Sequence, residues 1–322
     1  MGQIGVLRGG PLTTVQDQGR PGQRALGVPP GGALDLFAAQ VANLLAANPA
    51  EAAVLEITHG GVILRFEDER QLAWSGGDCI MRVGGEVIPP GRRALVRPGE
   101  ELEFDRFDRG CRAWLAIGGG IEVPMLLGSR ATDLRAGFGG SAGRALRDGD
   151  RLSLGPANPL PPGAPRLANW RAPVEWTQTA LRDPILRVVP GAEWKEFSRE
   201  ARSNFLQTAF TVSVQSDRMG ARLVGAELQR RTRRELLSEA VAPGTVQVAR
   251  DGQPILLLGD CQTIGGYPKI AHVITVDLGL AAQLRPNDTV RFQEITRAEA
   301  TTLFATRAAD LRLFQTGVQL QP

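Results

Sequence analysis

The sequence predicts a mainly β protein made of two related barrel-like parts with a few helices. Short apolar or alternating runs recur along the chain, and Gly, Pro or Asp turns separate nearly all of them; this pattern is typical of sandwiches and barrels. The length of 322 residues fits about two domains. Similar turn-then-strand units occur in both halves, at 97–104 and at 285–292, which indicates internal symmetry.

Strand signals fill the first half of the chain and resume after a proline-rich stretch. The expected strands of the first half are Ile4–Leu7, Val54–Thr58, Val62–Phe66, Gln71–Trp74, Ile80–Val83, Ala94–Val96, Leu102–Phe104, Ala113–Ile117 and Ile121–Val123. Those of the second half are Ile185–Val189, Thr245–Val248, Ile255–Leu258 and Ile270–Val276.

Three helices are expected among these strands. Leu34–Ala46 carries five large apolar residues on one face, and Asn48-Pro49 ends it. The other two are Arg199–Gln207 and Arg297–Leu313.

Proline and glycine concentrate between residues 155 and 183 and disfavour regular structure there. We therefore expect an N-terminal β-rich domain at 1–165, a linker at 166–183 and a C-terminal β-rich domain at 184–322. Trp170 and Trp176 lie inside this linker, which indicates that it packs on something.

The composition is that of an ordinary globular protein, with 43% hydrophobic and 22% charged residues and a net charge of +3. The charge is small and mixed, so we expect no nucleic-acid partner. Three widely spaced cysteines and two histidines predict neither a disulfide framework nor a metal site. The N-terminus has no signal-peptide core and no apolar run is long enough to span a membrane. We expect a cytoplasmic protein with no membrane partner.

The most informative stretch is Leu256–Asp277, which contains the single tyrosine of the chain. Between two apolar runs lies Gly265-Gly266-Tyr267-Pro268-Lys269. The two glycines allow close approach of a ligand, and the proline restricts the turn. A phenol and an ammonium on one short turn are plausible donors to an anionic or carbonyl substrate. The alternative is an ordinary hairpin turn with a solvated lysine.

A second motif, Thr14–Asp35, places Asp17, Arg20 and Arg24 among glycines and prolines. Such a loop can present guanidinium groups to a carboxylate or phosphate. The alternative is that Asp17 and Arg20 form a pair that pins a long loop and that Asp35 is only a helix cap.

Two further loops carry charged side chains among glycines. In Ile117–Arg144, glycine runs can nest an anion with help from Arg130 and Arg144, although the spacing is neither a Walker A nor a Rossmann motif. Gln215–Gly225 holds Asp217 and Arg218.

Two single residues stand outside these loops. Glu239 is a possible acid or base, or a surface carboxylate. His272 lies in an apolar run, and we interpret it as a core residue.

Together these motifs resemble one family over nearly the full length, the group of 5-oxoprolinase C-type subunits. This group is also called biotin-dependent carboxyltransferase or KipA-like, and it includes allophanate hydrolase subunit 2. The matching runs are TVQDQGRPGQRALGVPPGGALD, AIGGGIEVPMLLGSRATD, GGSAGRAL, SDRMGARL, LLSEAVAPGTVQV and GQPILLLGDCQTIGGYPKIAHVI. This chain departs from the usual pattern at Gly31-Gly32, where Ser-Gly is common, at Ala131, where Ser is common, and at Cys261, where Arg is common.

The resemblance implies a cyclophilin-like β-barrel architecture in two related parts. It implies a subunit of an ATP-dependent complex that opens the 5-oxoproline lactam to L-glutamate, active only with partners. These partners are a KipI-like protein, similar to the B-type subunit of 5-oxoprolinase, and a lactam-hydrolysing A-type subunit, with ATP and Mg²⁺ in the complex. The implied catalytic residues are Tyr267, Lys269 and Asp217. The implied substrate-binding residues are Arg20, Arg24, Arg130, Arg144, Arg218, Gly265 and Gly266.

The family leaves two other functions open. In a urea-carboxylase-like system the same turn would position carboxybiotin and an amide acceptor. Because this chain has no Met-Lys-Met-type segment, the biotin would be carried by a separate protein. The other function is regulatory, with a KipA-like protein sequestering a KipI-like kinase inhibitor.

Overall fold

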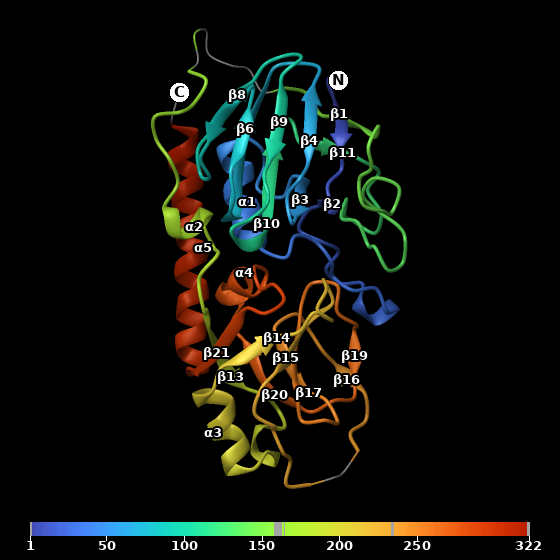
Figure 1. Ribbon diagram of the computed structural model, residues 1–322, viewed down its shortest axis with the longest axis vertical. Helices are drawn as coiled ribbons and strands as arrows, with labels where there is room; N and C mark the ends of the chain where they lie inside the picture. The colour runs from blue at the N-terminus through green and yellow to red at the C-terminus, as the bar shows by residue number, and fades with distance from the viewer. Residues whose placement is uncertain (1, 158–162, 164, 233–234, 321–322) are drawn as a thin grey trace. The chain divides into compact units, whose positions relative to one another are not determined.

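The computed structural model describes residues 2–157, 163, 165–232 and 235–320. The mainly β architecture is confirmed (Figure 1). The chain forms two compact units. The N-terminal unit comprises 1–20, 31–180 and 311–322, and the C-terminal unit comprises 21–30 and 181–310. Segment 21–30 thus belongs to the C-terminal unit and segment 311–322 to the N-terminal unit, the reverse of what chain order alone would assign.

Part of the expected linker packs within the N-terminal unit. The backbone N–H of Leu95 donates to the carbonyl oxygen of Arg166 at 2.8 Å, and the N–H of Ala168 donates to that of Arg93 at 2.9 Å. The unit boundary falls between Ala180 and Leu181.

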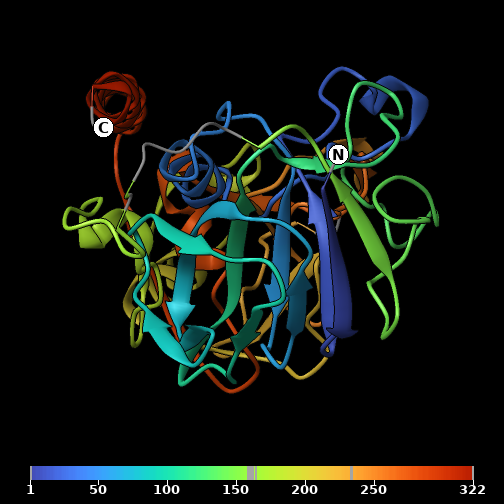
Figure 2. The same ribbon diagram turned by 90° about the horizontal axis from the view of Figure 1, so that it is seen from above.

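The N-terminal unit consists of two sheets. One has seven strands in the order β11-β12-β1-β4-β9-β6-β7, and the other has five in the order β2-β3-β10-β5-β8. Figure 2 shows strands of this unit running side by side near the N-terminus. The strands are β1 (Gly2–Arg8), β2 (Leu12–Gln16), β3 (Val54–Thr58), β4 (Ile63–Phe66), β5 (Arg70–Asp78), β6 (Met81–Val83), β7 (Glu86–Ile88), β8 (Ala94–Val96), β9 (Glu101–Phe104), β10 (Arg109–Ile117), β11 (Ile121–Glu122) and β12 (Arg151–Leu154).

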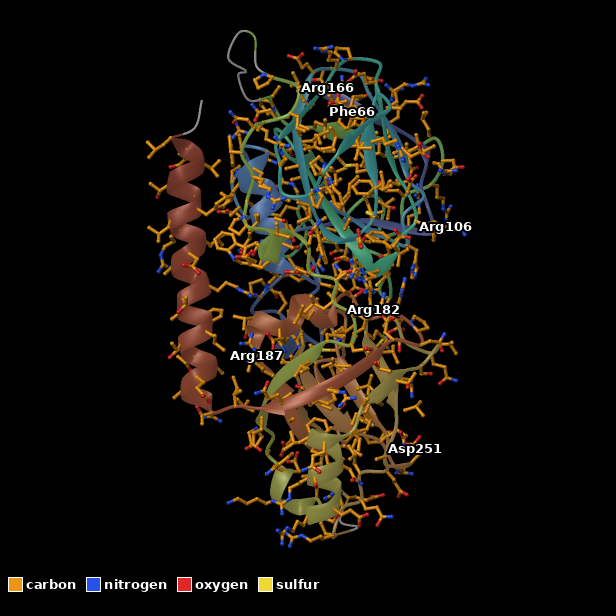
Figure 3. All side chains as sticks on the ribbon, turned by 60° about the vertical axis from the view of Figure 1, so that its left-hand side comes forward. Phe66, Arg106, Arg166, Arg182, Arg187 and Asp251 are labelled. Carbon is orange, nitrogen blue, oxygen red and sulfur yellow. The ribbon has the colours of Figure 1, made fainter. Side chains whose placement is uncertain are left out.

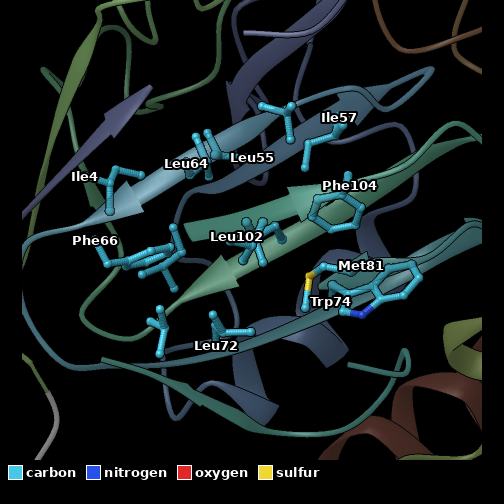
Figure 4. Packing of buried hydrophobic residues seen from close by; sticks show 14 of the residues in the cluster. Ile4, Leu55, Ile57, Leu64, Phe66, Leu72, Trp74, Met81, Leu102 and Phe104 are labelled. Carbon is cyan, nitrogen blue, oxygen red and sulfur yellow. The ribbon is translucent and has the colours of Figure 1, made fainter. Parts of the chain in front are cut away.

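One buried cluster joins the two sheets, because alternate residues of their strands face each other (Figure 4). Ile4 and Phe104 come from the larger sheet, while Leu55 and Trp74 come from the smaller one. The Trp74 and Phe104 rings meet edge to face at 5.3 Å, and the indole N–H donates to the carbonyl oxygen of Ile88 at 2.9 Å.

Two helices accompany these sheets, α1 (Leu36–Leu45) and α2 (Val174–Thr177). Asp35 caps α1 by accepting from the N–H of Ala38 at 2.9 Å, so this carboxylate has a structural task. The buried residues of α1 include Val41 and Leu45, both from the expected apolar face.

The C-terminal unit closes into a barrel in the order β13-β20-β17-β18-β15-β14-β21. Its strands are β13 (Ile185–Pro190), β14 (Phe210–Val212), β15 (Gly220–Val224), β17 (Thr245–Val248), β18 (Pro254–Leu257), β20 (Lys269–Val273) and β21 (Thr289–Glu294). A separate two-stranded ribbon pairs β16 (Glu239–Ala240) with β19 (Ile264–Gly265). The remaining elements are η1 (Arg24–Leu26), η2 (Trp194–Glu196), η3 (Thr275–Asp277), α3 (Arg199–Gln207), α4 (Leu278–Ala281) and α5 (Arg297–Gln319).

Aromatic packing and one ion pair hold the barrel. The rings of Phe205 and Phe292 stack at 4.4 Å, and Phe210 lies 6.1 Å from Phe292. Arg187 on β13, labelled in Figure 3, makes a bidentate contact with buried Asp277 at 2.9 and 2.5 Å. These contacts join α3 and η3 to strands β13, β14 and β21.

Helix α5 extends the expected Arg297–Leu313 segment to Gln319. Val318 near its end is buried. In the C-terminal unit Arg307 donates to the carbonyl oxygen of Val276 at 2.6 Å. In the N-terminal unit Phe314 meets Trp176 edge on at 5.6 Å.

The barrel core yields a stability prediction. Phe292→Ala should lower the free energy of unfolding by about 3–5 kcal/mol, because it removes a fully packed ring and leaves a cavity. Chemical denaturation measures the loss. Gln293→Ala, at the next and exposed position of β21, is the matched control and should stay within about 0.5 kcal/mol of wild type. Equal losses for both variants would contradict the assignment of Phe292 to the core.

Candidate functional site

A β-bulge arranges the start of β20, where the Tyr267–Lys269 turn ends. Thr245 pairs with His272 and Val246 with Ala271, but Gln247 pairs with Lys269. One step along β17 is thus matched by two steps along β20, so the latter strand holds one extra residue. As a result Lys269 and His272 share a face with Gln247 and Thr245.

This shared face is polar although it is largely buried. Thr245 and Gln247 are 0% and 1% exposed, and Lys269 is 7% exposed. The hydroxyl oxygen of Thr245 lies 3.2 Å from Nδ1 of His272. Burial lowers the pKa of His272, and the charge of Lys269 lowers it further, so the imidazole is neutral at neutral pH. The sequence predicted a core histidine with its polar atoms satisfied; His272 is half-buried, with the Thr245 hydroxyl beside its ring.

Lys269 is a buried cation between two carboxylates. Its Nζ lies 2.5 Å from Oε2 of Glu239 and 3.8 Å from Oε1 of Glu193. The backbone N–H of the same lysine donates to Oε2 of Glu193 at 2.8 Å. A buried ammonium is stable only when it is paired and hydrogen-bonded. Glu193 therefore fixes both the bulged backbone and the surroundings of the amine.

The ribbon delivers the second carboxylate. Glu239 pairs with Gly265 across β16 and β19, and its side chain is 64% exposed while that of Lys269 is 8% exposed. The hydrogen bond and charge of Lys269 lower the pKa of Glu239. Glu239 is thus an ionised group that reaches from solvent to a buried amine.

A hollow of about 890 Å³ is lined by Pro268 and Gln247, the neighbours of Lys269 along the chain and across the sheet, whereas Lys269 and Glu239 themselves do not line it. Gly265, Gly266 and Tyr267 line it, together with the amides of Gln247 and Gln262. Tyr267 is 42% exposed, and its carbonyl oxygen accepts from Nε2 of Gln247 at 3.1 Å.

Close packing explains the glycine at position 265. A Cβ there would lie 2.8 Å from Nε2 of Gln247, so a larger residue would displace this amide. The turn is therefore a shaped wall of the hollow, with a phenol, amides and backbone groups as hydrogen-bonding partners.

Arg24, on η1, belongs to the same unit. Its Nη2 lies 3.5 Å from the carbonyl oxygen of Thr263, one residue before β19. Burial raises the pKa of Cys261 to about 11, against the opposing charge of Arg24. Cys261 is therefore a buried thiol beside the ribbon, and Arg24 is a half-buried cation that contacts the residue before β19.

Asp217 and Arg218 form the turn before β15. Oδ1 of Asp217 accepts from the N–H groups of Met219 and Gly220 at 2.8 and 3.2 Å. The Arg218 guanidinium binds both carboxylate oxygens of Asp260, at 2.8 and 3.3 Å. Both side chains are thus engaged in holding loops.

In the N-terminal unit, Asp17 and Arg20 hold the glycine-rich loop. Arg20 is fully buried, donates to the carbonyl oxygen of Ala131 at 2.5 Å and lies 4.7 Å from the Phe138 ring centroid. Asp17 accepts from the hydroxyl of Ser129 at 2.5 Å. Both residues thus hold the loop through contacts with the segment 129–138.

Arg130 and Arg144 also have protein partners. Arg130 contacts Glu122 at 3.0 Å. Arg144 binds both oxygens of Asp150 at 2.7 and 2.8 Å, which lowers the pKa of that carboxylate.

Sequence reasoning missed Glu193, Gln247 and Gln262. Gln247 had a signal, since it follows the apolar–polar alternation of Thr245–Val248. Glu193 had none, because it is 76 residues from Lys269 in the chain.

The described residues contain no group of three or more His, Cys, Asp or Glu side chains that could hold a metal ion. Within that same part of the chain, no helix is both long and apolar enough to cross a membrane.

The Lys269–Glu239 pair generates a pH prediction. Lys269→Met should return the pKa of Glu239 to its ordinary value of about 4.3. Because the pKa in the folded state is lowered, the contact stabilises the fold above about pH 4.3, and this contribution is lost as the pH falls through the lower folded value.

Carboxyl NMR titration, with Glu239→Gln to assign the signal, checks this shift. The control is Lys195→Met, since Lys195 is exposed and is the other lysine of the chain. An unchanged Glu239 titration in Lys269→Met would refute the pairing.

The comparisons with known proteins agree over most of the chain. The family described as carboxyltransferase domain, subdomain A and B, matches residues 26–294. The C-type subunit of 5-oxoprolinase from Escherichia coli is 40% identical over 92% of both chains, and that from Haemophilus influenzae is 36% identical over 90% of both. The solved Kluyveromyces lactis urea carboxylase has a TM-score of 0.89 and 29% identity over 99% of this chain, which spans 30% of that longer chain. The barrel, the ribbon and the Tyr267–Lys269 turn thus lie in a chain that belongs to the family of the carboxyltransferase domain, subdomains A and B.

Proposed function

We propose that this chain is one component of a 5-oxoprolinase complex that opens the 5-oxoproline lactam to L-glutamate with ATP. The observation that carries the proposal is the 40% identity to the C-type subunit of the E. coli 5-oxoprolinase over 92% of both chains. The companions are a KipI-like, B-type subunit and a lactam-hydrolysing A-type subunit, and the chain acts only in their presence.

In this proposal the Tyr267–Lys269 turn stabilises the lactam carbonyl. The carbonyl oxygen gains negative charge as the ring opens, and fixed donors that meet this charge lower the barrier. The Tyr267 hydroxyl donates from the wall of the hollow, and Lys269 supplies a positive charge held in place by Glu239 and Glu193. The amide of Gln247 keeps the turn in position.

Three arginines of the glycine-rich loops, Arg20, Arg130 and Arg144, already have protein partners, which argues against a phosphate-binding role for them. Arg20 donates to a backbone carbonyl in the protein interior, while Arg130 and Arg144 are paired with Glu122 and Asp150. Releasing the Arg20 contact would cost most, because its guanidinium and Ala131 are both buried. We therefore place ATP and Mg²⁺ on the companion subunits and assign no step on this chain to them.

Carboxyl transfer is the second candidate function. Its support is the 0.89 TM-score to urea carboxylase over 99% of this chain. Biotin on a separate carrier would supply the carboxyl group. The amides of Gln247 and Gln262 and the Tyr267 hydroxyl offer donors and acceptors that suit a urea-like amide.

The first test is reconstitution. The chain is co-expressed with its B-type and A-type companions, and ADP release is measured with and without 5-oxoproline. Release that depends on both 5-oxoproline and this chain supports the oxoprolinase function. A stable complex without such release contradicts it, and carboxyl transfer from a biotinylated carrier to urea then tests the second function. Binding of the KipI-like companion without either activity would indicate the regulatory role.

The second test addresses the turn. Lys269→Met should lower kcat/KM of the reconstituted complex about a hundredfold, because it removes the positive charge behind the turn, and Tyr267→Phe should lower it about tenfold or more, because it removes a donor to the developing oxyanion. Lys195→Met, the matched lysine control, should keep wild-type activity. Full activity of both Lys269→Met and Tyr267→Phe would remove the turn from the catalytic machinery.

A further inference from the structure

The hollow at the Tyr267 turn has a second wall, formed by the hairpin that joins β17 to β18. Arg250 stands in this hairpin and lines the hollow, as do Gly266 and Tyr267. The backbone N–H of Val248 donates to the carbonyl oxygen of Pro268 at 2.9 Å, so the two segments run side by side where they leave the barrel. Arg250 and Tyr267 therefore line one cavity from neighbouring segments.

The hairpin holds Arg250 on a fixed backbone. The N–H of Gln253 donates to Oδ1 of Asp251, which is labelled in Figure 3, at 3.0 Å. A second segment supports the hairpin, because the N–H of Leu228 donates to the carbonyl oxygen of Gly252 at 3.0 Å. The fold thus sets the position of the arginine and leaves its side chain accessible.

The Arg250 guanidinium has no strong partner among the described residues. Its Nη2 lies 3.6 Å from Oε1 of Glu235, beyond hydrogen-bond distance, and the two side chains are 87% and 90% exposed. An exposed pair of this kind contributes little to stability. Arg230, the other arginine in the described lining, is largely buried and pairs with Glu196. Arg250 is thus the guanidinium of the hollow that can bind a ligand without loss of a buried contact.

The charge of the hollow suits a ligand with a single negative charge. Its described lining carries two arginines and two glutamates, Arg230, Arg250, Glu227 and Glu235, and is formally neutral. A multiply charged phosphate would meet as much negative as positive charge there. A carboxylate needs only one guanidinium, which it binds through two parallel hydrogen bonds.

Resting on the proposed function, we propose that Arg250 binds the carboxylate of 5-oxoproline while the Tyr267 turn holds the lactam carbonyl. Relatives that this chain matches over 90% or more of their length are named as subunits of 5-oxoprolinase. In 5-oxoproline the carbonyl and the carboxylate flank the ring nitrogen, and the carboxylate is ionised at neutral pH. The ligand therefore needs a hydrogen-bond donor and a cation in one cavity, and the two walls of the hollow supply them.

Arg250 is then a specificity-determining residue. It offers the anionic lactam an ion pair that a neutral lactam such as 2-pyrrolidinone cannot make. The carboxylate keeps its charge while the ring opens, so this contact is equally strong in the ground state and in the transition state. Its loss should therefore raise KM and leave kcat nearly unchanged. Urea, the neutral acceptor of the second candidate function, would make no use of this guanidinium.

The test measures ADP release by the reconstituted complex as the concentration of 5-oxoproline varies. Arg250→Gln should raise KM at least about tenfold and keep kcat within about twofold of wild type. Arg250→Lys, which keeps the charge without the planar fork, should recover part of the loss. Because the side chain is exposed, Arg250→Gln should keep the wild-type melting temperature. Arg291→Gln is the matched control, since Arg291 is exposed on β21 of the same unit and does not line the hollow.

The outcomes separate this proposal from the proposed function. Wild-type KM in Arg250→Gln overturns the carboxylate contact, while ADP release that depends on 5-oxoproline and on this chain still supports the function. A fall in kcat with unchanged KM also overturns the contact, as does an equal rise in KM in Arg291→Gln. A wild-type complex that releases no ADP with 5-oxoproline contradicts the proposed function, and the contact is overturned with it.

Discussion

Burial of the Lys269 ammonium is the constraint on which the C-terminal unit's site depends. A cation at that depth needs anions within reach, and the fold supplies them from two separate segments, the ribbon with Glu239 and the turn before η2 with Glu193. The β-bulge turns the lysine toward them by shifting the register by one residue. The same shift places His272 and Gln247 on this face. A substitution at either residue therefore also disturbs the surroundings of Lys269.

Much of the fold was predictable because the local signals were strong. Hydrophobic periodicity predicts the strands and the helix at Leu36–Leu45, and helix-capping and Gly or Pro residues predict where the helix ends and where the turn before Lys269 lies. The division into units was harder, since segment 21–30 joins the C-terminal unit through contacts distant in the chain, such as Arg24 with Thr263. Residue patterns carry no measure of such long-range pairing.

The sequence predicted those site residues that are neighbours along the chain, but not the partners that tertiary contacts bring to them. Tyr267 and the two glycines, adjacent in the sequence, line one hollow, and Lys269 follows at the first position of β20. The arginines of the N-terminal unit looked equally available, yet Arg20 and Arg144 are committed to a carbonyl and a carboxylate. Whether a guanidinium meets a ligand or a neighbouring side chain depends on tertiary contacts that spacing does not encode. The same holds for Glu193.

The scarcity of lysine has a consequence for how this protein can be studied. Of 37 basic residues only two are lysines, one exposed on η2 and the other enclosed by carboxylates. Arginine does not deprotonate and resists acylation, so side-chain amine chemistry in this chain is confined to Lys195 and Lys269. A mild acylating reagent therefore measures directly how accessible Lys269 is. The acylation rate of Lys195 measures the strength of the reagent. The acylation rate of Lys269 changes when ligand entry or the docking of a companion opens or closes the carboxylates around it.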